Sequence, residues 1–361
     1  MTQEHQFNYK WTLKDTVFTK DKGKVFSCFA CGGGSTMGYK LAGFDVLGCN
    51  EIDSKMMAAY KANHNPKYAY LEPIQTFKLR DDLPQELYEL DILDGSPPCS
   101  SFSMAGNREK DWGKEKVFRE GQAEQVLDIL FFDFIDLAKK LRPKVVIAEN
   151  VKGLLMGSAK EYVRNIYREF DLAGYYVQHF LLDASKMGVP QRRERVFFIA
   201  FRKDLAAPFL EQVDFFAIVP KLKLEFNEPK IFFSEVKTND LDRPFKLNSK
   251  ICEIFENRKD GDIDFSNACG RLYNKSNLLF NYTYTYDYEV SKTLTAKSHN
   301  VVFHSEIGRY YNIKETIAIS TFPMDYDFVK NQPHYICGMS VPPIMTAQIA
   351  KQIYEQWLSK I

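Results

Sequence analysis

Short apolar runs alternate with helix-like stretches through the first half of the chain. The apolar runs predict strands over residues 25–29, 46–49, 91–93, 145–148 and 196–201. Between them, apolar residues recur at helical spacing, most clearly over 123–141, and Pro143 follows that stretch. This rhythm predicts an α/β fold, a doubly wound, mostly parallel sheet with helices on both faces.

The rhythm breaks after residue 203. From 204 to 290, Asn, Asp, Lys and aromatic residues dominate without clear periodicity, which indicates a second, smaller domain of irregular or β content. Within it, the alternating Tyr and Thr of NYTYTYDY (281–288) predict a strand. Regular patterns return at 291 and end in a helix expected from Ile344. We therefore expect three segments, 24–203, 204–290 and 291–361, the last returning to the first domain.

Composition limits the class of protein. The chain has 361 residues, with 48 Lys and Arg against 47 Asp and Glu, so a polybasic nucleic-acid coat is excluded but a local basic cleft is not. No stretch approaches 18 uninterrupted apolar residues, so we expect no membrane span. The start is polar, without a signal-peptide pattern, and the seven cysteines are an odd number. A cytoplasmic protein without disulfides is expected.

Four polar or reactive clusters directly follow predicted strands, at 29–34, 50–53, 95–99 and 149–150. Because the carboxyl ends of parallel strands meet at one edge of a sheet, we expect the four clusters to converge on one crevice. Cys28 and Cys31 form a CxxC in this region, but no second pair follows at zinc-site spacing, so no metal is expected.

The first two clusters indicate an adenosine-containing cofactor. The glycines of FACGGG (29–34) allow a ligand close to the backbone, and Glu51 follows about 20 residues later, as suits a ribose diol. A plain tight turn and a solvated loop carboxylate are the alternatives at these two positions.

The other two clusters carry reactive side chains. In GSPPC (95–99), two prolines fix the backbone before Cys99, which suits a positioned nucleophile as well as a packed cysteine beside a turn. Glu149 follows VVIA, where a partly desolvated carboxyl can donate a proton; a helix-capping pair with Asn150 is the alternative.

A basic segment precedes the predicted strand at 196–201. Residues 186–203 hold six basic side chains and one acid, Glu194. On a strand, Arg193 and Arg195 of QRRER would point to the same face. A solvated edge strand is the alternative reading.

The Pro-Cys pair, ENV (149–151) and QRRER (191–195), in this order and spacing, make the chain similar to cytosine-5 DNA methyltransferases of the bacterial type. The resemblance covers about residues 24–202 and 291–361. It implies an S-adenosylmethionine-dependent methyltransferase fold, with 24–203 as the catalytic and cofactor-binding domain, 204–290 as the target-recognition domain and 291–361 completing the catalytic domain.

The resemblance also implies roles for single residues. Cys99 matches the nucleophile that adds to carbon 6 of cytosine, and Glu149 matches the acid that bonds ring nitrogen 3. Arg195 matches the residue that contacts the base oxygen and orients the carboxylate, with Arg193 as its neighbour. The carbonyl of Pro97 matches the group that meets the exocyclic amine. Residues 100–120 match a loop that closes on DNA.

The implied cofactor is S-adenosyl-L-methionine. Glu51 matches the ribose carboxylate, and Ser340 and Val341 lie near the methionine end. The full implied cofactor set is Phe29, Ala30, Cys31, Gly32, Gly33, Gly34, Glu51, Ile52, Ile74, Pro97, Leu130, Ser340 and Val341. Several positions depart from the family pattern: Cys31 replaces a glycine, Pro73 an aspartate and Met339 an asparagine, and Ser96-Pro97-Pro98 stands where Gly-Phe-Pro is more frequent.

The implied function is methyl transfer to carbon 5 of a flipped-out cytosine in a specific duplex DNA sequence, through a covalent Cys99 adduct. We expect a monomer acting on double-stranded DNA without membrane, with a cognate restriction endonuclease as a functional but not physical partner. The alternatives are a tRNA cytosine-5 methyltransferase and a catalytically silent DNA-binding regulator. A nicotinamide oxidoreductase would explain the glycine turn and Glu51 but not Pro-Cys or QRRER.

Overall fold

The computed structural model describes residues 5–98, 115–116, 125–126, 129–212, 218–240, 243–297, 300–302 and 308–361. The chain forms two compact units. The sheet unit comprises Val17–Asp183, Glu194–Glu225 and Thr346–Ile361, and the second unit comprises Met1–Thr16, Ala184–Arg193 and Phe226–Met345. These units are defined by packing, so the functional division at 24–203, 204–290 and 291–361 stays a prediction.

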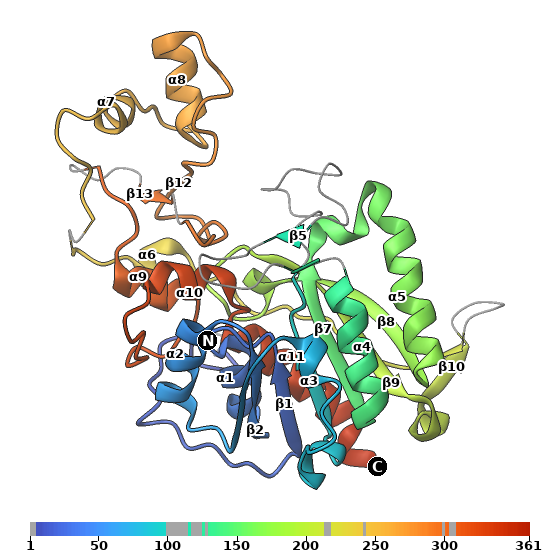
Figure 1. Cartoon of the computed structure of the whole chain (residues 1–361). Coiled ribbons are helices and arrows are strands. Elements are labelled where there is room, and N and C mark those ends of the chain that lie inside the picture. The colour runs from blue at the N-terminus through green and yellow to red at the C-terminus, as the bar shows by residue number, and fades with distance from the viewer. Residues whose placement is uncertain are drawn as a thin grey trace. The chain divides into compact units, whose positions relative to one another are not determined.

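The sheet unit contains a seven-stranded sheet in the order β3-β2-β1-β4-β7-β9-β8 (Figure 1). Its strands are β1 (Lys24–Cys28), β2 (Asp45–Glu51), β3 (Tyr68–Leu71), β4 (Ile92–Gly95), β7 (Val145–Val151), β8 (Tyr175–Asp183) and β9 (Glu194–Arg202). The first five pair in parallel, whereas β9 runs antiparallel to both β7 and β8. The predicted doubly wound, mostly parallel sheet is confirmed.

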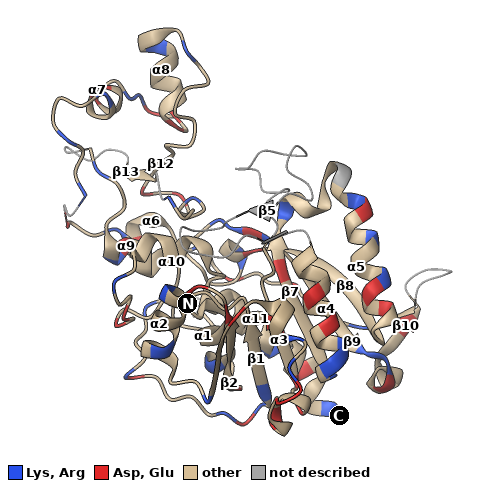
Figure 2. Cartoon of the chain, viewed as in Figure 1, with Lys and Arg blue, Asp and Glu red and all other residues tan. Residues whose placement is uncertain are grey.

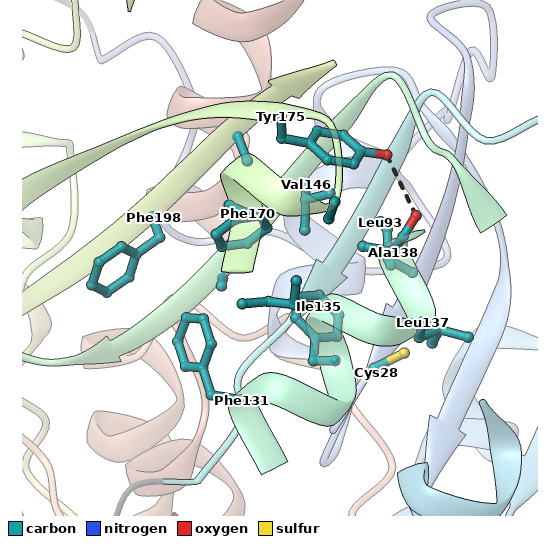
Figure 3. Close-up of a cluster of buried hydrophobic side chains, with 14 of the residues drawn as sticks. Cys28, Leu93, Phe131, Ile135, Leu137, Ala138, Val146, Phe170, Tyr175 and Phe198 are labelled. Atoms are coloured by element: carbon teal, nitrogen blue, oxygen red, sulfur yellow. Dashed lines mark hydrogen bonds between the residues drawn. The ribbon is translucent and has the colours of Figure 1, made fainter. Parts of the chain in front are cut away.

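Helices cover both faces of this sheet. They are α1 (Gly34–Leu41), α2 (Ser54–His64), α3 (Ile74–Phe77), α4 (Leu130–Leu141), α5 (Lys160–Leu172) and α11 (Pro343–Gln356). α3, α4 and α5 pack on one face and form a large apolar core with it, in which Phe131 lies edge-on to Phe198 at 5.5 Å (Figure 3). On the other face, Trp357, just after α11, stacks on Phe201 at 4.5 Å.

α5 shows how sequence periodicity produces this packing. Tyr162, Ile166 and Phe170, four residues apart, are buried against the core, whereas Lys, Arg, Asp and Glu occupy its outer side (Figure 2).

Short strand pairs lie outside the main sheet: β5 (Glu115–Lys116) with β6 (Gln125–Val126), and β10 (Leu210–Gln212) with β11 (Ile218–Pro220). In the described part of the chain, no helix has the length and apolar character needed to cross a membrane.

The second unit is more helical than the sequence predicts. It contains α6 (Phe233–Val236), α7 (Lys250–Glu256), α8 (Phe265–Tyr273), α9 (Ile313–Ile319), α10 (Pro333–Met339) and the parallel pair β12 (Tyr284–Thr285) and β13 (Val301–Val302). The expectation of irregular or β content over 204–290 is therefore wrong for α7 and α8. Ser249 and Asp264 cap their first turns, which starts each helix without strong periodicity.

The predicted strand at 281–288 is also wrong, because only Tyr284 and Thr285 form one. Tyr284 and Tyr286 pack into an apolar cluster with Phe245, Phe255 and Phe265 instead of alternating across a sheet. Aromatic side chains at alternate positions therefore reflect burial against α7 and α8 here, not an extended strand.

Candidate active site

The loop between β1 and α1 is held in an unusual backbone conformation. Phe29, Cys31 and Gly33 have φ angles of 53°, 49° and 82°, in the left-handed region. The Gly33 amide donates to the Ala30 carbonyl at 2.8 Å, and Gly33 is the N-cap of α1. Cys31 occupies a position where glycine would be unstrained, which gives a physical reason for the glycine that the family pattern has there.

Gly33 faces a buried histidine. A Cβ atom at Gly33 would lie 2.2 Å from Nε2 of His64, which itself lies 3.3 Å from the Gly32 carbonyl oxygen. Burial lowers the pKa of His64 to about 3, and the charge of Lys40 adds to this effect. The loop therefore rests on a neutral imidazole and has no room for a side chain at Gly33.

Gly33→Ala should destabilise the protein by several kcal/mol, because a Cβ both clashes with His64 and strains a left-handed residue. Gly157→Ala is the matched control: its φ is 59°, but nothing lies within 4 Å of its Cβ position, so only the strain of about 1 kcal/mol remains. Urea unfolding of both variants measures the difference, and equal losses would contradict the crowding argument.

His64 should make the fold sensitive to acid. Its folded pKa lies below its unfolded value, so its contribution to stability is present above about pH 6.5 and is lost as the pH falls. Between pH 6.5 and 5 the loss should be about 2 kcal/mol. Urea unfolding at pH 7 and pH 5 should show that His64→Gln loses less stability than the wild type; an unchanged difference would exclude this origin.

Glu51 ends β2 beside the same loop. One carboxylate oxygen accepts the Cys31 amide at 2.7 Å, and the other accepts the amides of Ile52 and Asp53, each at 2.8 Å. Burial raises the pKa of Glu51, and these amide bonds oppose the rise. The predicted pairing of the loop with Glu51 is thus present in the fold, and the oxygen that accepts only the Cys31 amide keeps capacity to accept a hydroxyl group.

The other predicted cofactor residues of the sheet unit lie in different settings. Ile52 is half-buried next to Glu51, whereas Ile74 and Leu130 belong to the apolar core behind the sheet. Glu72, next to the unusual Pro73, forms an ion pair with Arg80 at 2.9 Å.

The structure brings Glu149 and Arg195 together. In the antiparallel register, Glu149 lies opposite Phe197 and Arg195 opposite Val151, so both side chains occupy one face of neighbouring strands. Arg195 Nε lies 2.9 Å from Glu149 Oε1, and the two side chains are 16% and 13% exposed. The pair is therefore partly desolvated but still accessible from solvent.

Asn150 points to the opposite side and binds the strand-end loop after β4. Its amide donates to the Pro97 carbonyl at 3.1 Å and is almost fully buried. This bond fixes the backbone two residues before Cys99. Cys99 itself, and most of the predicted loop at 100–120, lie outside the described residues.

Arg193 does not share a strand face with Arg195, because β9 begins at Glu194. Arg193 belongs to the second unit, is 1% exposed and donates to the carbonyls of Leu294 and Gly338 at 2.9 and 3.1 Å. The expectation that both arginines point to one face of a strand is wrong, and a catalytic role for Arg193 stays a prediction.

Ser340 and Val341 follow α10 in the second unit and are both buried. The hydroxyl of Ser340 has no hydrogen-bond partner in the described part of the chain. A buried hydroxyl of this kind fits a residue that bonds to a ligand. Among the described residues, no group of three His, Cys, Asp or Glu side chains could hold a metal ion.

Much of the positive charge at 186–203 is internally balanced. Arg195 pairs with Glu149, Arg202 with Asp204 and Lys203 with Asp171, and Arg193 is buried. The segment is therefore largely a structural ion-pair region, and its sequence charge overstates the charge available to a partner.

Sequence reasoning missed Asp94, the last polar residue before Gly95. Its carboxylate is 4% exposed and accepts bonds from the hydroxyls of Ser27, Ser35 and Tyr39 at 2.5, 2.7 and 3.0 Å. The signal was available, because Asp94 stands at a strand end, as the four clusters do, one residue before the third of them.

Comparison with known proteins identifies the family. The model of the C-5 cytosine-specific DNA methylases matches residues 23–355, so the chain belongs to this family. It is 37% identical over 182 residues to the type II methyltransferase M.FnuDI of Fusobacterium nucleatum, a match covering 50% of this chain and 48% of that protein. The chain thus spans about half the length of this relative, and similarly half of M.NgoPII of Neisseria gonorrhoeae.

Longer matches extend over most of the chain at lower identity. The type II methyltransferase M.DdeI of Desulfomicrobium norvegicum is 26% identical over 91% of this chain and 88% of its own length. Among solved structures, DNMT2 of Spodoptera frugiperda superposes with a TM-score of 0.61 at 18% identity, covering 92% of this chain and 99% of that one. This similarity shows the methyltransferase fold.

Proposed function

We propose that the protein transfers a methyl group from S-adenosyl-L-methionine to carbon 5 of a cytosine in a specific duplex DNA sequence. The observation that carries the proposal is the Glu149–Arg195 pair on neighbouring strands, together with the Pro97 carbonyl that Asn150 holds. Family membership and the type II methyltransferases among its relatives support DNA as the substrate and a restriction-modification setting.

The cytosine would meet three fixed groups. Glu149 bonds ring nitrogen 3, Arg195 contacts the base oxygen while holding the Glu149 carboxylate in place, and the Pro97 carbonyl accepts from the exocyclic amine. These groups read the Watson–Crick edge, which is free only when the base has left the duplex stack. Base flipping therefore belongs to the proposal.

Cys99 would begin the reaction. Its thiolate forms a bond to carbon 6, and Glu149 supports protonation at nitrogen 3, so that carbon 5 becomes nucleophilic. Once carbon 5 carries the methyl group that the bound cofactor would supply, loss of the carbon 5 proton would expel Cys99 and restore the aromatic ring. For Arg193, the catalytic role stays a prediction, and its observed contacts are the hydrogen bonds that it donates to the carbonyls of Leu294 and Gly338.

The residues present fit the cofactor. The loop Phe29–Gly34 and the acceptor oxygens of Glu51 would hold the adenosine part, Ile52, Ile74 and Leu130 its apolar surroundings, and the Ser340 hydroxyl with Val341 the methionine part. When bound, S-adenosylmethionine supplies the methyl group. We propose that the enzyme acts as a monomer in the cytoplasm, with a cognate restriction endonuclease as functional partner.

Methylation assays test this function. Purified protein with labelled S-adenosylmethionine should methylate duplex DNA, and bisulfite sequencing of DNA from cells with and without the gene should reveal 5-methylcytosine at one short sequence. Methylation of tRNA but not duplex DNA would establish the RNA alternative. Sequence-specific DNA binding without any methyl transfer would establish the silent regulator.

A further inference from the structure

The carboxylate of Asp94 lies at the point where the strand order of the sheet reverses. β1 is followed outward by β2 and β3 on one side and by β4 and β7 on the other, and Ser27 of β1 pairs with Asp94 of β4. Ligands of doubly wound sheets bind at the carboxyl end of such a switch point. Asp94 therefore lies beneath the loop between β1 and α1. Ser27 and Ser35 flank that loop, and their hydroxyl groups both donate to the Asp94 carboxylate.

Asp94 is a buried anion without a cationic partner. Among the described residues, no Lys, Arg or His lies within ion-pair distance of it; its neighbours are the hydroxyls of Ser27, Ser35 and Tyr39. The titratable groups that interact with it are Cys28, Tyr39, Tyr60 and Glu149, all of them acids. Burial raises the pKa of Asp94 to about 6, and the charge of Glu149 adds to the rise.

A buried charge of this kind lowers the stability of the folded protein. Desolvating a carboxylate without a cation destabilises a protein, and neutral hydroxyl donors offset only part of that cost. An amide has a single acceptor oxygen and could accept at most two of these three hydroxyl protons, so the three donors account for a side chain with two acceptor oxygens. What the hydrogen bonds do not explain is a buried negative charge with no cation beside it among the described residues.

We propose that Asp94 is a positioning residue whose charge favours the methylated cofactor over the spent product. The inference rests on the proposed function, because it takes S-adenosylmethionine as the ligand of the loop above Asp94. S-adenosylmethionine carries a positive sulfonium, and S-adenosylhomocysteine, left after transfer, does not. The sulfonium sulfur is bonded directly to the adenosine part, which the loop would hold. A negative charge in the poorly hydrated site beneath that loop therefore stabilises only the first compound through this charge.

Isothermal titration calorimetry with each compound, at pH 8 where Asp94 is ionised, tests the proposal. In Asp94→Asn, the ratio of S-adenosylmethionine to S-adenosylhomocysteine affinity should fall about tenfold relative to the wild type. Asp91→Asn is the matched control: Asp91 precedes the same strand at its opposite end and pairs with Lys144 at 2.9 Å, so its loss should leave the ratio unchanged. Ser27→Ala, which keeps the charge, should also preserve the ratio.

A pH series provides a second measurement that needs no variant. In the wild type, the affinity ratio should fall as the pH drops below about 6 and Asp94 becomes neutral. A ratio unchanged in Asp94→Asn, or independent of pH in the wild type, would overturn the role of Asp94 while leaving the cofactor assignment intact. Failure of the wild type to bind either compound would overturn the cofactor assignment as well.

Discussion

Cys99→Ser should reduce methyl transfer to duplex DNA by at least about a thousandfold, while DNA and cofactor affinities stay within a few-fold of the wild type. A serine hydroxyl is far less ionised than a thiol near neutral pH and is a much weaker nucleophile toward carbon 6. Removing a nucleophile commonly costs several orders of magnitude in kcat. Single-turnover methylation and calorimetric binding measure the two effects separately.

The six other cysteines supply the control. All of them lie among the described residues, and Cys28, Cys49, Cys252, Cys269 and Cys337 are buried. Burial raises the pKa of Cys28 and Cys49, which makes these thiols poor nucleophiles. Burial also raises the pKa of Cys252, which belongs to none of the predicted catalytic or cofactor positions, so Cys252→Ser should retain methylation. Full activity in Cys99→Ser would remove Cys99 from the mechanism.

The central strands of the sheet could be predicted from the sequence, and its edge strands could not. β1, β2, β4, β7 and β9 are buried on both faces and so appear as apolar runs. β3 has no fully buried residue, and β8 contains Gln178 and His179 among alternately exposed positions. Strands at the two edges bury less apolar surface, which leaves a weaker pattern in the sequence.

The candidate site was predictable in composition but not in its contacts. Placing polar residues at the carboxyl ends of strands located Glu51 and Glu149 correctly, because that rule depends only on parallel pairing. The Glu149–Arg195 contact depends on the antiparallel register of β7 and β9, which no spacing along the chain determines. The same rule could have located Asp94, which stands at a strand end, but its contacts with hydroxyl groups of β1 and α1 are seen only in the assembled fold.

Glu149→Gln should lower kcat for DNA methylation by about 10²–10⁴-fold, with little change in cofactor affinity. Glutamine can bond the cytosine ring but cannot supply a proton to nitrogen 3, so the addition of Cys99 would lose its acid support. The change also leaves the Arg195 guanidinium, 16% exposed, without its carboxylate partner. Steady-state methylation kinetics and calorimetry with S-adenosylmethionine measure the two effects.

Glu194→Gln is the matched control, because Glu194 is a neighbouring carboxylate on β9 that pairs with Lys152 at 2.9 Å and is 44% exposed. Glu194→Gln should keep nearly full activity. An exposed ion pair contributes little to stability, and Glu194 and Arg195, as successive residues of β9, point to opposite faces of the sheet. If Glu149→Gln raised KM for DNA and left kcat unchanged, Glu149 would bind the base without acting as an acid. The addition of Cys99 would then need its proton from another group, and the ion pair with Arg195 would serve only to position the ring.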